Sequence, residues 1–182
     1  MIVISAARRF PAGFTLVELM LVVTVIGILS AVAVPSMQRA RGAAYEASTI
    51  GSLHIIHSAQ TSFSASCGGG YYAPSIPWLA TKPTGSKIPF IGPEFTVNTF
   101  TRQGYTIRFT QGAVVATAPA TCNGLGKGLA VSTFFVAADI LLLADGVNRY
   151  FGVNGGGVIF QSTKRVPVTQ TGSPPAPAKP IG

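Results

Sequence analysis

The chain has 182 residues, enough for one ordinary domain with a modest core. It is 48% hydrophobic and only 10% charged, against about 25% charged in a typical soluble domain. The net charge of +8 is spread thinly, without the Lys/Arg cluster that marks a nucleic-acid-binding surface, which argues against dedicated nucleic-acid recognition. Five acidic residues offer no convincing carboxylate pair for acid–base catalysis, so we expect no enzyme activity and no cofactor.

The N-terminal part of the chain contains one long apolar run, Phe14 to Val34. As a helix it would be about 31 Å long, close to the thickness of a bilayer's hydrocarbon core. Arg8 and Arg9 precede it, so the positive-inside rule leaves the N-terminus in the cytoplasm. Three interpretations compete: a secretory signal cut near Ala31–Ala33, a twin-arginine signal, and a cut before the run that leaves the span on the mature protein.

A glutamate near the start of this run, Glu18, helps to choose among them. An ionisable group in hydrocarbon costs about 2.5–3.5 kcal/mol and is usually functional, and the apolar region of a signal peptide has no place for it. The stretch "GFTLVE" resembles the processing site of type IV pilins and type II secretion pseudopilins, and the resemblance runs from Arg8 to about Phe63. The resemblance favours the third interpretation, a cut before the apolar run that leaves the span on the mature protein.

The resemblance implies roles for single residues. A prepilin peptidase would cut between Gly13 and Phe14, removing a leader of residues 1–13, and Phe14 would become N-methylated. Glu18 would be the assembly residue, because its carboxylate can pair with the Phe14 amine of a neighbouring subunit in the apolar filament core. Gly27 and Pro35 weaken the helix and are its expected breaking points. Partial melting between them, as in stretchable pili, and a simple kink in the span are both open.

Beyond the span we expect the same helix to continue, with 14–35 as membrane span and filament core and 36–66 as an amphipathic half. Apolar residues recur on one face at helical spacing: Tyr45, Leu53, Ile56, Ala59 and Phe63. The glycines after Cys67 should end the helix. His54 and His57 share a helix face, but a metal site needs further ligands, so no metal is expected.

Residues 67–165 predict a globular β domain. A Pro- and Gly-rich connector, packed down by Trp78, Phe90 and Phe95, should come first. Strands are then expected in "YTIRFTQGAVVATA" and "LAVSTFFVAADILLLA", the second with a tail that suits a helical turn. A hairpin about Asn154-Gly155 follows, and Asp145-Gly146 is a further turn candidate. The fold class is α+β, a long helix packed on a small antiparallel sheet. The proline-rich tail, 166–182, is expected to be disordered.

The two cysteines, Cys67 and Cys122, would lie outside the cytoplasm in this orientation. An oxidising compartment favours a disulfide between them, with two buried free thiols as the alternative.

The function expected from these features is a structural, type IV pilin-like subunit. It would sit in the inner membrane as a single-pass protein and assemble, with copies of itself and other pilin-like subunits, into a periplasmic or extracellular filament. The resemblance also implies a platform protein and an assembly ATPase as partners. A type II secretion pseudopilin is the alternative, although the carboxylate-rich calcium loop and the Trp-Gly-x-Pro-Tyr run typical of the major pseudopilin are absent. A membrane-anchored periplasmic enzyme or binding module is the remote alternative.

Overall fold

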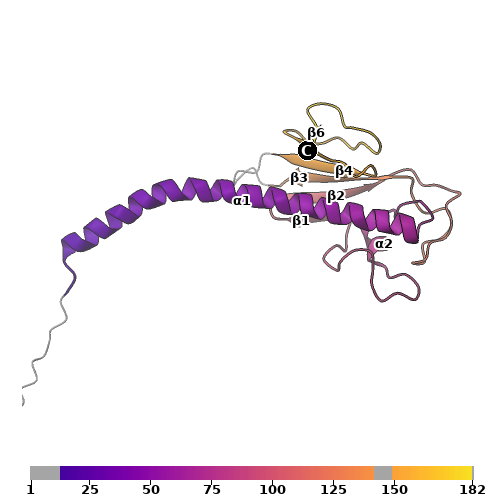
Figure 1. Cartoon of the computed structure of the whole chain (residues 1–182), viewed down its shortest axis with the longest axis horizontal. Helices are drawn as coiled ribbons and strands as arrows, with labels where there is room; N and C mark the ends of the chain where they lie inside the picture. The colour runs from indigo at the N-terminus through magenta and orange to yellow at the C-terminus, as the bar shows by residue number, and fades with distance from the viewer. Residues whose placement is uncertain (1–12, 142–148, 182) are drawn as a thin grey trace, which may run out of the picture. The chain divides into compact units, whose positions relative to one another are not determined.

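The computed structural model describes residues 13–141 and 149–181, and their elements form an α+β chain (Figure 1). The helices are α1 (Leu16–Ser66) and α2 (Ile76–Ala80). The strands are β1 (Thr99–Arg102), β2 (Tyr105–Gln111), β3 (Phe134–Ile140), β4 (Tyr150–Asn154), β5 (Ile159–Ser162) and β6 (Lys179–Pro180). The chain divides into two compact units between Gln38 and Arg39, so α1 contributes to both.

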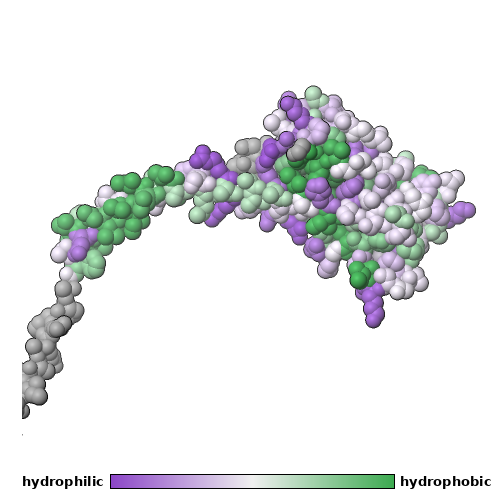
Figure 2. Space-filling model, in the orientation of Figure 1, coloured by the Kyte–Doolittle hydropathy of each residue, from purple (hydrophilic) through white to green (hydrophobic). Residues whose placement is uncertain are grey.

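The first unit contains the apolar half of α1. Every described residue up to Arg41 is exposed, and Phe14 is 80% exposed. Figure 2 shows an almost continuous hydrophobic surface along this part of the helix. The helix contains an 18-residue window that is long and apolar enough to cross a membrane, with none of that window buried. In water such a surface would be unfavourable, so this unit needs lipid or protein around it.

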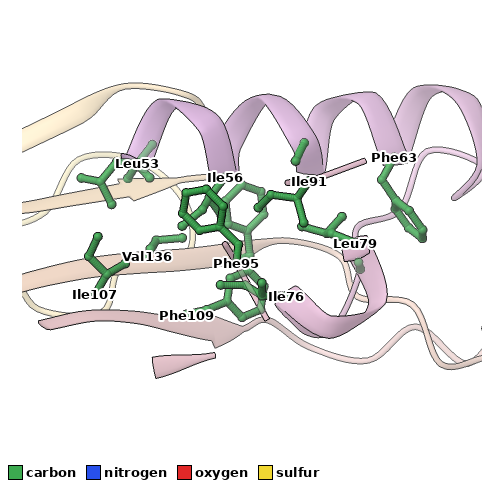
Figure 3. Packing of buried hydrophobic residues seen from close by; sticks show 14 of the residues in the cluster. Leu53, Ile56, Phe63, Ile76, Leu79, Ile91, Phe95, Ile107, Phe109 and Val136 are labelled. Atoms are coloured by element: carbon green, nitrogen blue, oxygen red, sulfur yellow. The ribbon is translucent and has the colours of Figure 1, made fainter. Parts of the chain in front are cut away.

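The second unit places the remainder of α1 against one face of a six-stranded antiparallel sheet, whose strand order follows the chain from β1 to β6. Figure 3 shows Leu53 and Ile56 of α1 pointing toward Ile107 and Val136 of the sheet. All four are fully buried, as is Phe63 further along the helix. This confirms the predicted α+β class, and the helical spacing identified the packed face correctly.

Helix α1 ends where the glycine run begins, as predicted. The amide of Gly68 donates to the carbonyl of Phe63, at 2.7 Å, and that of Gly70 to the carbonyl of Ser64, at 2.9 Å. Gly69 has φ of +59°, a conformation that glycine adopts without strain. Cys67, in the same turn, forms the expected disulfide with Cys122 and so ties the end of α1 to a loop far along the chain.

The connector differs in part from its expected form. Phe95 is fully buried, and Trp78 and Phe90 pack against the core, as predicted. Within it, however, lies α2, whose first turn contains a proline, where the missing N–H costs nothing. Strand β1 was also missed, because it is a short edge strand of four residues joined to β2 by Gln103 and Gly104, both at positive φ.

The later strands follow the predicted order with different limits. Strand β2 stops at Gln111, and beyond it Val114 makes only an isolated bridge to Val131. The hairpin of β4 and β5 is present, but its turn extends to Gly157, which has φ of +79° and donates to the carbonyl of Asn154. The Asp145-Gly146 turn and residues 142–144, the end of the second predicted strand segment, lie outside the described residues.

The expectation of a disordered tail is wrong for residues 166–181. Val166 is only 5% exposed and packs on Phe135 and Ala137, on the sheet face opposite α1. Strand β6 pairs with β5, and the side-chain Nδ2 of Asn154 donates to the tail carbonyls of Thr169, at 3.1 Å, and Gly172, at 2.9 Å. The composition of the tail predicted disorder. Proline, however, has no backbone N–H that needs a hydrogen-bond partner, so a proline-rich segment can cover a sheet face without regular structure.

Candidate functional site

The predicted processing site lies immediately before α1. Gly13 and Phe14 have no regular secondary structure, and helix geometry starts only at Leu16. Phe14 is largely exposed. The Gly13–Phe14 peptide bond is therefore outside the helix and accessible in this chain.

Glu18 closes a capping box with Thr15 at this helix start. The Glu18 carboxylate accepts from the Thr15 amide at 3.4 Å and from the Thr15 hydroxyl at 3.2 Å. In return the Thr15 hydroxyl accepts from the Glu18 amide, also at 3.2 Å. This Thr-x-x-Glu arrangement satisfies backbone donors that have no partner within the helix, and it places a negative charge at the positive end of the helix dipole.

The capping box gives Glu18 a hydrogen-bonding role within its own helix. Its partner within the described chain is Thr15, rather than Phe14. A carboxylate has about four acceptor sites, so one that caps its own helix can still accept a hydrogen bond from another chain. The sequence contains the signal for this box, since Thr15 precedes Glu18 by three residues.

The two expected breaking points lie inside an uninterrupted α1. The helix runs through Gly27 and Pro35 without a change of secondary structure. Near the proline, the Ser36 hydroxyl donates to the carbonyl of Ala33, at 2.8 Å. Their role as breaking points therefore stays a prediction.

In the second unit, a partly buried ion pair joins α1 to the residue that precedes β4. Glu46, 6% exposed, accepts from Nε and Nη2 of Arg149, 103 residues away in sequence. Tyr105, fully buried, donates its hydroxyl to the Arg149 carbonyl at 2.7 Å. Burial and the nearby Glu46 charge raise the pKa of Tyr105, while the hydrogen bond to Glu46 raises the pKa of Arg149. Both groups therefore keep their ordinary protonation at neutral pH.

A second acid is neutralised on the opposite sheet face. Asp139 of β3, 6% exposed, lies 4.0 Å from Arg108 and 3.7 Å from Arg165. No local sequence pattern predicts these pairs, because the partners are distant in sequence: Arg149 just before β4, Arg108 in β2 and Arg165 just after β5.

The two histidines differ in their surroundings. His54 is exposed, whereas His57 is half-buried beside the β4–β5 turn, with a backbone hydrogen bond to Gly155. A Cβ atom at Gly157 would lie 2.9 Å from the His57 ring, which shows how closely the two pack. Burial is the main reason that the pKa of His57 is lowered. Among the described residues no group of three His, Cys, Asp or Glu side chains is arranged to hold a metal.

A long apolar helix, capped by a glutamate in its first turn and packed in its second half on an antiparallel sheet, defines a pilin-like α+β protein. Residues 8–34 match the prokaryotic N-terminal methylation motif, the prepilin signature of type IV pilins and pseudopilins. No curated protein and no solved structure is detectably similar to the chain. The motif supports a pilin-like or pseudopilin-like subunit.

Proposed function

We propose that this chain is a type IV pilin-like subunit that is cleaved, N-methylated and assembled into a helical filament. The observation that carries the proposal is the methylation motif at residues 8–34, which spans both the cleavage position and the exposed apolar helix. Prepilin peptidase would cut after Gly13 and methylate Phe14. A platform protein and an assembly ATPase would then move the subunit from the inner membrane into the fibre.

The exposed first unit supports this route physically. In the membrane its apolar side chains contact lipid, and in a filament they would contact the same helices of neighbouring subunits. Helices in lipid associate through close packing, and the small residues Gly27, Ser30 and Ala31 allow their backbones to approach. The N-terminus would be cytoplasmic and the 39–182 unit periplasmic, where the Cys67–Cys122 disulfide would be stable.

A type II secretion pseudopilin is the second candidate, since the same signature occurs in both classes. The two classes differ in companion machinery and fibre length, which a subunit sequence records poorly. Deleting the chromosomal gene should abolish surface fibres for a pilin, whereas for a pseudopilin it should block protein secretion and leave surface fibres in place.

The processing step is tested by N-terminal sequencing and mass measurement of the membrane-bound protein. We expect the mature chain to start at N-methylated Phe14, and Gly13→Leu to leave the full-length precursor uncut in the membrane. Gly13→Ala serves as the matched control, because it should be cut, if more slowly. A wild-type chain that starts at Val34 would instead establish a secretory signal and refute the proposal.

A further inference from the structure

A surface pocket of about 370 Å³ lies where β4, β5 and β6 meet in the second unit. Of the described residues that line it, all but the proline have a polar or charged side chain: Arg149, Gln161, Ser162, Thr163, Pro177 and Lys179. This volume falls within the range of small-molecule sites in proteins, about 300–1,000 Å³. The pocket exists only because the tail folds back onto the sheet, since two of the lining residues belong to the tail.

Strand pairing fixes the positions of its polar groups. Gln161 of β5 lies directly opposite Lys179 of β6, and Tyr150 of β4 lies opposite Ser162. Directly opposed residues project from the same face of a sheet, so Gln161 and Lys179 point to one side. Nη1 of Arg149 donates to Oε1 of Gln161 at 2.6 Å, which brings the guanidinium to that side as well.

The charge of the pocket is positive. Arg149 uses Nε and Nη2 for the buried Glu46, yet its side chain remains 47% exposed. Lys179 is exposed. Among the described residues that line the pocket there is no acid, so none of them neutralises the ammonium of Lys179. Glu46 also fixes the guanidinium in place, which lowers the entropy cost of using its remaining N–H groups for a ligand.

We propose that this pocket binds a phosphate monoester. A guanidinium edge, a lysine ammonium and the hydroxyl of the exposed Thr163 form a donor set that phosphate oxygens prefer, and a monoester has a charge of about −1.5 to −2 at neutral pH. The ring of Pro177 provides an apolar wall for the carbon part of the ligand. That ligand could be a phosphorylated sugar or the phosphate-bearing head group of a lipid, which share this chemistry.

The test titrates the full chain, in non-ionic detergent, with three probes: inorganic phosphate, glucose 6-phosphate and glycerol 3-phosphate. Calorimetry should show saturable one-to-one binding of at least one monoester, tighter than that of inorganic phosphate. Amide signals of residues 161–163 and 179 should shift in ¹H–¹⁵N spectra of the same samples. Preference for glucose 6-phosphate would indicate a sugar ligand, and preference for glycerol 3-phosphate a lipid head group.

Lys179→Gln is the decisive variant, because it removes one positive charge from the pocket while the backbone pairing of β6 remains. We expect binding about tenfold weaker, as for the loss of one charge-assisted hydrogen bond. Lys127→Gln is the matched control: it removes the same charge from an exposed lysine outside the lining and should leave the affinity unchanged. Equal weakening by both variants would mean diffuse attraction to a cationic chain and would overturn the proposal. So would the absence of saturation at millimolar concentrations, or binding of a DNA oligonucleotide but of no monoester.

Discussion

At the scale of single residues, Glu18 has two roles, and a single substitution can remove both at once. Its carboxylate caps α1 through Thr15, and we propose that its charge pairs with the Phe14 amine of a neighbouring subunit. Replacement by valine removes both the cap and the charge. Glutamine can still occupy this position of a capping box, so it removes the charge alone.

Glu18→Gln and Glu18→Val should both be cleaved and inserted normally, since each suits an apolar helix better than glutamate does. Both should fail to assemble, because the Phe14 amine would be left without its partner in the apolar core, at a cost of about 3–5 kcal/mol. Glu18→Asp, which keeps the charge but is shorter, should give intermediate yields. The measurement is filament yield after shearing, alongside membrane levels of the mature subunit. Normal filaments from Glu18→Gln would show that the cap, rather than the charge, is what assembly requires.

His57 gives the second unit a predictable pH dependence. Its pKa is lowered in the folded state, chiefly by burial, so the folded chain binds a proton less readily than the unfolded chain. Its contribution to stability is therefore complete above the unfolded pKa of about 6.5 and is lost as the pH falls through the lowered folded value. Urea midpoints measured between neutral and mildly acidic pH should decrease, and His57→Gln should flatten that dependence. His54→Gln, at an exposed position one turn away, should retain most of the pH dependence. A wild-type urea midpoint that does not change with pH would refute the assignment of this dependence to His57.

At the scale of elements, the tail behaves as part of the sheet. A Cβ atom at Gly152 of β4 would lie 2.7 Å from Phe135 and 3.2 Å from Val166, so the tail and two strands meet without spare volume. The Thr133 hydroxyl donates to the backbone carbonyl of Gln170 at 2.9 Å, and the side-chain Nε2 of Gln170 donates to the backbone carbonyl of Gln111 at 3.0 Å. These contacts attach the tail on the face that α1 does not cover.

Val166→Ala should therefore destabilise the second unit by about 1–3 kcal/mol, the range expected when a buried side chain loses two methyl groups. Val168→Ala is the matched control, because that side chain is 55% exposed and its truncation should cost little. The free energy of unfolding, from urea titration of the full chain, distinguishes the two. Equal stabilities would mean that the tail does not pack on the sheet in solution.

At the scale of the whole molecule, the surfaces of the two units suit different surroundings. The described part of the first unit is apolar and exposed, whereas the second has its own core, built from α1, α2 and the sheet. The boundary between Gln38 and Arg39 falls within one continuous helix. Each unit can therefore satisfy its own surroundings, the first in lipid or filament and the second in water.

A fragment of residues 39–182 should fold alone as a water-soluble domain with the Cys67–Cys122 disulfide intact. The expected evidence is a cooperative thermal transition, dispersed amide signals and a disulfide in non-reducing mass spectrometry. The full chain should instead need detergent, because its exposed apolar helix would aggregate in water. A fragment that is insoluble or lacks cooperative unfolding would show that the second unit depends on the first.

The sequence alone was sufficient wherever the determining interactions are local. The length and hydropathy of Phe14 to Val34, the acid at Glu18 and the helical spacing of Leu53, Ile56 and Phe63 depend only on neighbours along the chain. They predicted the span, the signature and the packed face of α1. The glycine run after Cys67 likewise predicted where α1 ends.

Only the tertiary structure decided features that join distant residues. Arg149 lies beside Glu46 and Gln161 because strand order brings β4 to β5 and to the helix, and no local pattern encodes a pair 103 residues apart. The tail reads as disordered because its own segment cannot form a core. It is ordered because Phe135 and Ala137 present an apolar face that Val166 can cover. Burial depends on the partner surface as much as on the segment that is buried, and the partner is known only once the chain has folded.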